Sequence, residues 1–264
     1  MEQLSRSHAR FAVEATAVRG DEVTFGPETA RQLARVLRFR PGEVLTVMVE
    51  GREIAVRLEH LEPGRGRGRV LGPVERFSEP GVTVAVVQAL LKGDRTDLVV
   101  QKATELGASH IFPVVTVRTV VRPDADTGRL RRWEKIAREA AEQSLRTRVP
   151  VLHPPQQLAA AVGQARNLLP EAGLIVLWEE EERVGLWDLL PCVGPDIILV
   201  MGPEGGLTRQ EVDGILALGG RSASLGTRIL RSETATLAAL TLVLAARGEL
   251  GRAPGRPAER GSPA

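Results

Sequence analysis

The stretch that decides the fold is Ile197-Ile-Leu-Val-Met-Gly-Pro-Glu-Gly-Gly-Leu-Thr-Arg-Gln-Glu211. It begins with a short apolar run, which is typical of a strand buried on both faces of a parallel sheet. The glycines and the proline that follow predict a tight turn whose backbone can approach a ligand closely. Thr208 is a good helix N-cap, and Glu211 completes a capping box for a helix over residues 209–218. The stretch therefore predicts a strand, a ligand-approaching loop and a helix.

The glycine loop differs from two familiar phosphate-binding motifs. No Gly-Lys-Ser/Thr follows it, so it is not a Walker A loop, and its Gly-x-x-Gly-Gly spacing is not the dinucleotide fingerprint. The chain also has no Gly-x-Gly-x-x-Gly near an early strand with an acidic residue about 20 positions further on. The sequence thus argues against a nicotinamide-dependent oxidoreductase.

Outward from this stretch, strands and helices alternate. Apolar runs over residues 82–89, 111–115 and 174–177 predict further buried strands. Helical spacing of apolar side chains predicts helices over residues 95–106, 130–144 and 235–246, the first of which ends at Gly107. Alternation of this kind indicates a mostly parallel α/β sheet.

The N-terminal part has a different pattern. Short strands are predicted over residues 9–15, 44–49, 54–58 and 69–71, with a helix over residues 27–37, and this spacing suggests a small β-barrel. The Gly/Arg run over residues 64–69 is either an RNA-contacting loop or a flexible hairpin turn. We expect a barrel domain over residues 1–77, an α/β domain over residues 78–250, and a disordered Gly/Pro/Arg-rich tail over residues 251–264.

The composition is that of an ordinary globular protein. The chain has 264 residues, of which 43% are hydrophobic, 26% charged and only 3% aromatic, so an aromatic stacking surface is excluded. Cys192 is the lone cysteine, which suits a reducing cytoplasm and excludes an intramolecular disulfide or a cysteine-based zinc site. We expect no signal peptide, no membrane span and no metal site.

The charges are skewed and unevenly distributed. Only three of the 35 basic residues are lysines (Lys92, Lys102 and Lys135), and arginine suits phosphate recognition, although a background bias toward arginine is the alternative. Residues 118–148 hold nine basic and five acidic side chains, whereas residues 171–196 hold seven acidic side chains and only Arg183. The basic stretch is either a solvated helix face or a polyanion-binding surface.

A second unusual segment is Ser224-Leu-Gly-Thr-Arg-Ile-Leu-Arg-Ser-Glu-Thr-Ala235. It reads as an irregular loop between a strand and an apolar helix. Ile229 and Leu230 lie between two arginines, and such an apolar pair needs something to pack against. An ordinary loop with solvated arginines is the alternative, but the apolar pair would be unusual on an open loop.

Together these segments resemble the RsmE family, RNA methyltransferases of the SPOUT superfamily. The resemblance covers about residues 8–250, and several ordered motifs carry it. The matching residues are Arg35-Val-Leu-Arg38 with Gly42; Lys92-Gly93; Gln101-Lys102-Ala-Thr-Glu105-Leu-Gly107; Trp133, Lys135-Ile136, Glu139-Ala140 and Glu142-Gln143-Ser144; Arg146, Arg148 and Pro150; Gly202-Pro-Glu-Gly-Gly206; Leu225-Gly226, Ile229-Leu-Arg231 and Glu233-Thr-Ala235. The chain departs from the usual pattern at Gln32, Val49, Glu50, Leu145 and Ser232.

The resemblance implies a PUA-like N-terminal β-barrel and a parallel α/β domain with a deep C-terminal trefoil knot. It implies a cytoplasmic homodimer that uses S-adenosylmethionine to methylate N3 of a uridine in small-subunit ribosomal RNA. A non-catalytic RNA-binding protein of the same fold is the alternative. The intact glycines of both loops favour the enzyme.

The resemblance also implies roles for individual residues. Arg231 is the first candidate for stabilising negative charge on the uracil, and Arg10 is the second; Glu233 is interpreted as a helix-start residue rather than a base. The expected cofactor-binding residues are Leu177, Met201, Gly202, Pro203, Glu204, Gly205, Gly206, Leu225, Gly226, Ile229 and Leu230. The expected RNA-binding residues are Arg10, Arg35, Arg38, Lys92, Arg95, Lys102 and Arg146.

Overall fold

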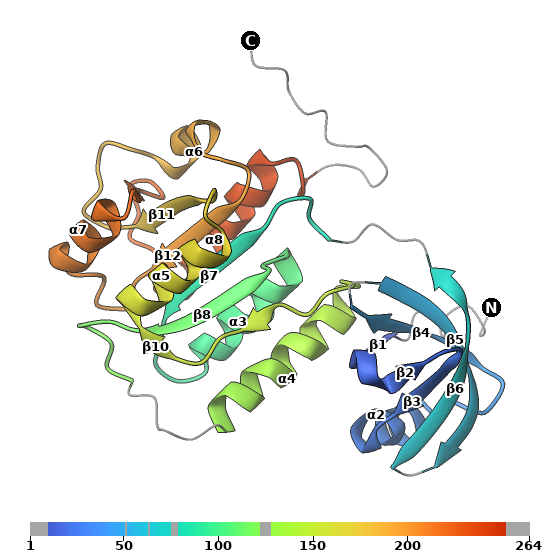
Figure 1. The fold of residues 1–264 in the computed structure, drawn as a ribbon. Helices are drawn as coiled ribbons and strands as arrows, with labels where there is room; N and C mark the ends of the chain where they lie inside the picture. The colour runs from blue at the N-terminus through green and yellow to red at the C-terminus, as the bar shows by residue number, and fades with distance from the viewer. Residues whose placement is uncertain (1–9, 51, 63, 75–78, 122–127, 252–264) are drawn as a thin grey trace. The chain divides into compact units, whose positions relative to one another are not determined.

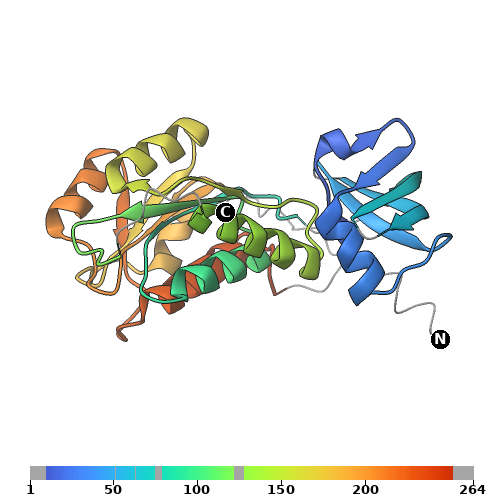
Figure 2. The same cartoon turned by 90° about the horizontal axis from the view of Figure 1, so that it is seen from below.

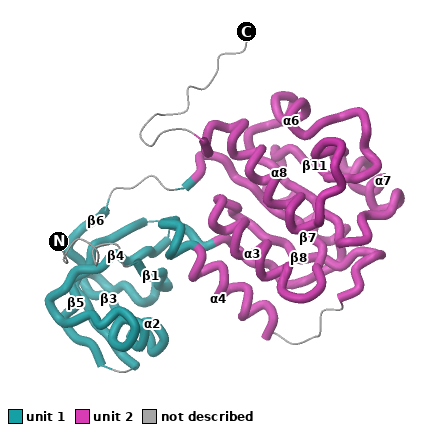
Figure 3. The backbone as a smooth tube through the Cα atoms, turned by 180° about the vertical axis from the view of Figure 1, so that it is seen from behind, with its two compact units in different colours: residues 1–79, 141–149 teal, residues 80–140, 150–264 magenta. Residues whose placement is uncertain are grey.

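A computed structural model describes residues 10–50, 52–62, 64–74, 79–121 and 128–251. The chain forms two compact units, one of residues 1–79 and 141–149 and the other of residues 80–140 and 150–264 (Figure 3). The predicted tail beyond Gly251 lies outside the described residues.

The first unit is built on a curled six-stranded sheet, labelled in Figure 1. Its strand order is β1-β4-β5-β6-β3-β2, and all neighbouring strands are antiparallel except the parallel pair β1 and β4. Apolar side chains such as Phe11, Phe25 and Leu33 fill its core. The elements are β1 (Arg10–Ala12), η1 (Ala15–Ala17), β2 (Val18–Arg19), β3 (Glu22–Phe25), α2 (Pro27–Arg31), η2 (Gln32–Val36), β4 (Val44–Val49), β5 (Arg52–Glu62) and β6 (Arg65–Val74).

Two predictions in this unit need correction. The expected helix over residues 27–37 is α2 followed by the π-helical turn η2, because the Leu37 N–H bonds to the Gln32 carbonyl. Most of the Gly/Arg run lies in strand β6 rather than in a turn or loop. Gly66 and Gly68 are buried, and a Cβ on Gly68 would collide with Val56, so only glycine fits on the inner face.

The second unit is a parallel seven-stranded sheet with helices on both faces. The strand order is β10-β8-β7-β12-β11-β13, with β9 pairing β8. Figure 2 shows α5 and α7 on one face of the sheet and α3 and α8 on the other. The elements are β7 (Val84–Ala89), α3 (Arg95–Leu106), β8 (His110–Val115), α4 (Gly128–Gln143), β9 (Val151–Leu152), β10 (Gln156–Gln157), α5 (Leu158–Leu168), β11 (Gly173–Leu177), α6 (Leu186–Leu189), η3 (Leu190–Cys192), β12 (Ile197–Met201), α7 (Arg209–Ala217), β13 (Arg221–Ala223) and α8 (Ser232–Ala246).

Residues 197–211 fold as predicted, into a buried strand, a glycine-rich turn and a capped helix. All five residues of β12 are buried in the middle of the sheet between β7 and β11. The Thr208 side chain accepts the Glu211 N–H, and the Glu211 carboxylate accepts the Thr208 N–H, so the predicted capping box of α7 is confirmed. The turn between β12 and α7 therefore lies at the carboxyl edge of the sheet. Within the described part of the chain, no helix is long and apolar enough to cross a membrane.

Candidate functional site

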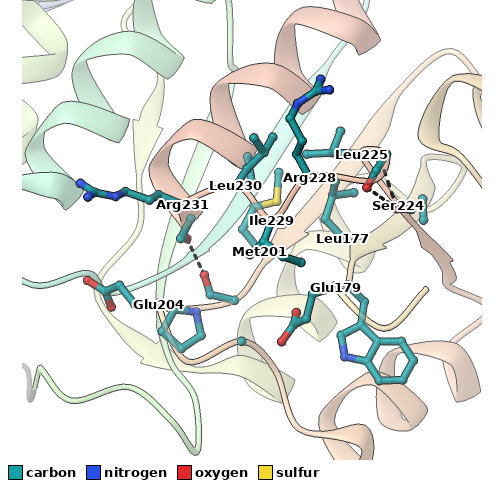
Figure 4. A pocket seen from close by; sticks show the side chains of 18 of the residues that line it. Leu177, Glu179, Met201, Glu204, Ser224, Leu225, Arg228, Ile229, Leu230 and Arg231 are labelled. Carbon is teal, nitrogen blue, oxygen red and sulfur yellow. Dashed lines mark hydrogen bonds between the residues drawn. The ribbon is translucent and has the colours of Figure 1, made fainter. Parts of the chain in front are cut away.

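A pocket of about 450 Å³ lies at the carboxyl edge of the parallel sheet (Figure 4). Its floor contains Leu177, Met201 and Ala223, which are the last residues of β11, β12 and β13. Ligands of open α/β sheets bind at this edge, where loops leave neighbouring strands. The volume lies within the usual range for a small-molecule site.

Two loops form most of the walls, and both are segments that the sequence singled out. Residues 202–206 follow β12, and residues 224–231 connect β13 to α8. Of the expected cofactor-binding residues, those that line the pocket are Leu177, Met201, Gly202, Pro203, Glu204, Gly206, Leu225, Gly226, Ile229 and Leu230. Gly205 is not among the lining residues.

Gly205 is instead held from outside the pocket. The Arg118 guanidinium donates a hydrogen bond of 2.8 Å to the Gly205 carbonyl oxygen. The neighbouring Val117 N–H donates to the carboxylate of Glu211 at 2.8 Å. The segment after β8 thus fixes both the glycine loop and the start of α7.

The backbone of the glycine loop explains its composition. The Gly206 N–H bonds to the Pro203 carbonyl at 3.0 Å and closes a turn, and Gly206 has a φ of +72°, which favours glycine. A Cβ on Gly202 would lie 3.1 Å from the backbone of Gly206 and Leu207. The loop therefore folds tightly upon itself and exposes backbone to the pocket.

A chain of hydrogen bonds under the pocket was missed by the sequence analysis. The Ser232 hydroxyl donates to the Gly202 carbonyl at 2.6 Å and accepts from the Gln88 amide at 3.1 Å. Thr236 donates to the same Gln88 side chain, and both of these residues are almost fully buried. Three segments meet here: β7, the glycine loop and the first turn of α8. Because the partners lie far apart in sequence, no local pattern revealed them.

Charged side chains surround the opening of the pocket. Figure 4 shows Arg228 and Arg231 pointing away from each other, with Arg231 on the same side as Glu204. Arg231 is exposed and occupies the N-cap position of α8, where its side chain makes no capping hydrogen bond. Glu233, in the first turn of that helix, is 8% exposed and does not line the pocket, so its position matches the helix-start interpretation.

Two further lining residues were not predicted. Trp178 is buried beneath the Arg209 guanidinium, which lies 4.3 Å from the centre of the indole ring. The Glu179 side chain lies against Gly206, where an added Cβ would collide with the carboxylate. Both directly follow the last residue of β11, Leu177, which is the one residue of this segment that the sequence predicted to bind the cofactor.

The expected RNA-binding residues fall into three groups: exposed side chains, partly exposed side chains that form ion pairs, and buried side chains. Arg35, Arg38 and Lys92 are exposed. Lys102 forms a 2.8 Å ion pair with Glu105, and Arg95 lines the pocket and contacts Glu204 and Glu233.

Arg10 and Arg146 are buried within the first unit, which corrects their interpretation as RNA contacts. The Arg10 guanidinium forms a 3.0 Å ion pair with Glu53 and donates to the Leu145 carbonyl, and only 1% of its side chain is exposed. Arg146 donates to Glu79 at 2.8 Å. Burial alone would raise the pKa of Glu79, but Arg146 and the N–H groups of Thr147 and Arg148 lower it. Both arginines are committed to carboxylates, so neither is retained as a catalytic or RNA-binding candidate.

The fold and the pocket define an RNA methyltransferase. A family model described as an RNA methyltransferase domain matches residues 78–244. The chain is 31% identical over 249 residues to the ribosomal RNA small subunit methyltransferase E of Bacillus subtilis, covering 89% of this chain and 95% of that protein. It is 35% identical over 217 residues to the protein of the same name from Mycobacterium tuberculosis, covering 80% of this chain and 81% of that one.

A solved structure agrees with these relatives. The ribosomal RNA small subunit methyltransferase E of Neisseria gonorrhoeae, bound to S-adenosyl methionine, superposes with a TM-score of 0.80 and 32% identity, covering 90% of this chain and 97% of that one. The chain belongs to the ribosomal RNA small subunit methyltransferase E family. Among the described residues, no group of three or more His, Cys, Asp or Glu side chains is placed to hold a metal ion.

Proposed function

We propose that this protein uses S-adenosylmethionine to methylate N3 of a uridine in small-subunit ribosomal RNA. The observation that carries the proposal is the pocket at the carboxyl ends of β11, β12 and β13, with the exposed Arg231 at its rim. The family and its cofactor-bound relative support the assignment.

The lining residues fit an adenosine-containing cofactor. Leu177, Met201 and Leu230 offer apolar surface to a flat base, which accounts for Leu230 of the apolar pair in the loop before α8. The glycine-rich turns present backbone N–H and carbonyl groups for polar edges. Glu179 makes no hydrogen bond or ion pair with another described residue, so its carboxylate is available to hydroxyl or ammonium donors.

Catalysis requires that the uracil N3 lose its proton while charge develops on O2 and O4. S-adenosylmethionine supplies an electrophilic methyl group, so the protein's task is to position the nucleophile and stabilise its charge. The Arg231 guanidinium is suited to this task, because it offers a positive charge with several N–H donors and makes no ion pair with a described residue. Its neighbour Ser232 fixes the backbone at this point through Gly202.

RNA binding is assigned to the exposed Arg35 and Arg38 of the first unit and to Lys92 of the second. Such phosphate contacts position an RNA, whereas selection of the base belongs to the pocket. The division into a PUA-like barrel domain and a SPOUT domain is part of the proposal.

A trefoil knot in the second unit is also proposed. The Ser224 N–H bonds to the Val184 carbonyl, and the Leu186 N–H bonds to the Ser224 carbonyl. The loop that enters α8 therefore runs directly beside the loop that leaves β11. This is where the chain would thread through itself.

A homodimer in the cytoplasm completes the proposal. Helix α8 is apolar around nearly its whole circumference, and Ala238, Leu242 and Ala245 remain partly exposed. A helix of this composition is normally covered on all sides. Ile229 and Trp187 are 83% and 56% exposed in the single chain. Sedimentation equilibrium should give twice the chain mass, and a monomer at micromolar concentration would contradict the dimer.

The direct test is methyl transfer to small ribosomal subunits. The purified protein should transfer label from methyl-labelled S-adenosylmethionine, and mass spectrometry of the RNA should place the methyl group on uridine N3. Arg231→Ala should slow single-turnover transfer by about 10²-fold or more, as expected for lost charge stabilisation. Binding of RNA without any transfer would favour a non-catalytic RNA-binding protein. Full activity in the variant would remove Arg231 from the mechanism.

A further inference from the structure

Arg95 lies between two carboxylates that belong to different segments of the pocket. One guanidinium nitrogen lies 3.2 Å from the carboxylate of Glu204, in the glycine loop, and Nε lies 3.6 Å from that of Glu233, in the first turn of α8. Arg95 is the first residue of α3 and lines the pocket itself. One side chain thus connects the starts of two helices to the glycine loop.

A second contact strengthens this connection. The backbone N–H of Lys92 donates to the same Glu204 oxygen at 2.9 Å. Burial alone would raise the pKa of Glu204, but the N–H donors and the charges of Arg95 and Lys92 lower it. The Glu204 carboxylate therefore stays ionised and holds the loop after β7 against the loop after β12.

The surroundings of Arg95 do not suit a phosphate contact. Two carboxylates already neutralise the positive charge of Arg95. One of them, Glu233, is only 8% exposed to solvent. The Oε2 atom of Glu233 accepts no hydrogen bond in the described structure. An approaching phosphate would meet both negative charges, and moving Arg95 away would leave a buried carboxylate without its counter-ion.

We propose that Arg95 is a positioning residue for the cofactor pocket and not an RNA contact. It acts through Glu204 and Glu233 to set the glycine loop against the start of α8, where Arg231 lies. This inference rests on the proposed function, because it assigns the pocket to S-adenosylmethionine. It also replaces the sequence-based interpretation of Arg95 as a phosphate ligand.

The test measures cofactor binding and RNA binding separately. S-adenosylmethionine is titrated calorimetrically into the full-length protein and into Arg95→Ala, in the absence of RNA. Binding to in vitro transcribed small-subunit ribosomal RNA is then measured at several salt concentrations. Arg132→Ala is the matched control, because Arg132 also pairs with acidic residues at the start of α3, Asp94 and Asp97, but lies outside the pocket lining.

The expected result is an approximately tenfold weaker Kd for S-adenosylmethionine in Arg95→Ala, with the slope of log K against log salt unchanged. Arg132→Ala should keep the wild-type Kd for the cofactor. A slope smaller by about one in Arg95→Ala would identify a phosphate contact and overturn the proposal. An unchanged cofactor Kd would overturn it as well.

Glu204→Gln provides a second route if Arg95→Ala folds poorly. It keeps the shape of the side chain, and it should also weaken cofactor binding. The double variant should lose less affinity than the two single losses combined, because both substitutions break one contact. Strict additivity would show that Arg95 does not act through Glu204. If the wild-type protein itself failed to bind S-adenosylmethionine, the proposed function would fail instead, which separates the two outcomes.

Discussion

The Ser232 hydroxyl and the Gly202 carbonyl oxygen are 2.6 Å apart, and this hydrogen bond ties the first turn of α8 to the glycine loop. The same hydroxyl accepts from Gln88, whose side chain is 1% exposed. Ser232, which directly follows the proposed catalytic Arg231, thus connects the start of α8 to the glycine loop and to β7.

Replacing Ser232 by Ala should destabilise the protein and loosen the pocket. The Gln88 amide would lose one partner in a buried setting, at a cost of about 1–3 kcal/mol in the free energy of unfolding. Urea denaturation measures this loss, and calorimetry should show weaker binding of S-adenosylmethionine. Ser232→Thr keeps a hydroxyl and should retain wild-type values. Equal denaturation midpoints for the Ala variant and the wild type would contradict this role.

Gly206→Ala should disturb the pocket through its backbone. The φ of +72° costs a residue with a Cβ about 1–2 kcal/mol, and the new methyl group would press against Glu179. Cofactor affinity should therefore fall, as calorimetric titration with S-adenosylmethionine would show. Gly214→Ala in α7 is the matched control, because a Cβ there meets nothing within 4 Å. That substitution should stabilise the protein by about 0.5–1 kcal/mol. Wild-type affinity in Gly206→Ala would show that the loop adapts freely.

Arg10→Met should lower the free energy of unfolding of the first unit. It should not remove a direct contact with RNA. It would leave Glu53, which is 2% exposed, without its counter-ion, at a cost of about 3–5 kcal/mol. Replacing both partners, as in Arg10→Met with Glu53→Met, should recover part of this loss, because the buried Glu53 carboxylate is removed together with its counter-ion. Chemical denaturation compares the three proteins. A single variant as stable as the wild type would refute the structural role of the ion pair.

Acid should destabilise the second unit through His153. The ring of His153 stacks on Phe112 with 3.7 Å between centroids and lies 3.3 Å from His110. Burial, followed by the charge of His110, lowers the pKa of His153 from 6.5 to about 4, and burial also lowers the pKa of His110. The folded protein therefore keeps this ring neutral while the unfolded chain takes up a proton. Stability should be complete above pH 6.5 and should fall as the pH drops from 6.5 toward 4.

Denaturation at a series of pH values measures this effect. The slope contributed by each histidine is at most about 1.4 kcal/mol per pH unit, and solvent screening reduces it. His153→Phe preserves the aromatic stack and should flatten the slope in this window. An identical slope in His153→Phe would assign the acid sensitivity to other groups.

Local patterns predicted those parts of the fold that depend on neighbouring residues. The capping box of Thr208 and Glu211 and the end of α3 at Gly107, with a φ of +115°, are encoded within a few positions, and both are confirmed. The first pocket loop was singled out by its glycines directly after a buried strand, and the second by the apolar Ile229–Leu230 pair between two arginines. Their assignment to a cofactor came from the family resemblance, since spacing alone specifies no ligand.

The sequence did not predict which arginines are exposed and which pair with buried carboxylates. Arg146 is separated by 67 positions from Glu79, its carboxylate partner, and Arg95 depends on two carboxylates more than 100 positions away. A basic residue in a helix or strand looks the same in sequence whether it meets solvent, RNA or a distant carboxylate. Only the tertiary structure separates the exposed Arg35 and Arg38 from the buried Arg10 and Arg146.

Arg38 gives the sharpest test of RNA binding by the first unit. It is exposed, follows the π-helical turn η2, and has a φ of +55°, a conformation that glycine adopts more easily. Arg38→Gly should therefore match or exceed the wild type in stability, while the slope of log K against log salt for small-subunit RNA falls by about one. Arg38→Ala should reduce the salt slope as much as Arg38→Gly does, but should be less stable than Arg38→Gly, because alanine keeps the Cβ. Comparing the two variants separates the effect of the lost charge from the effect of backbone strain. Arg67→Ala is the control, because the Arg67 guanidinium already lies 3.7 Å from the carboxylate of Glu22. This substitution should leave the slope of log K against log salt unchanged. If Arg67→Ala lowered the slope and Arg38→Gly did not, the RNA would lie across strand β6 rather than beside η2.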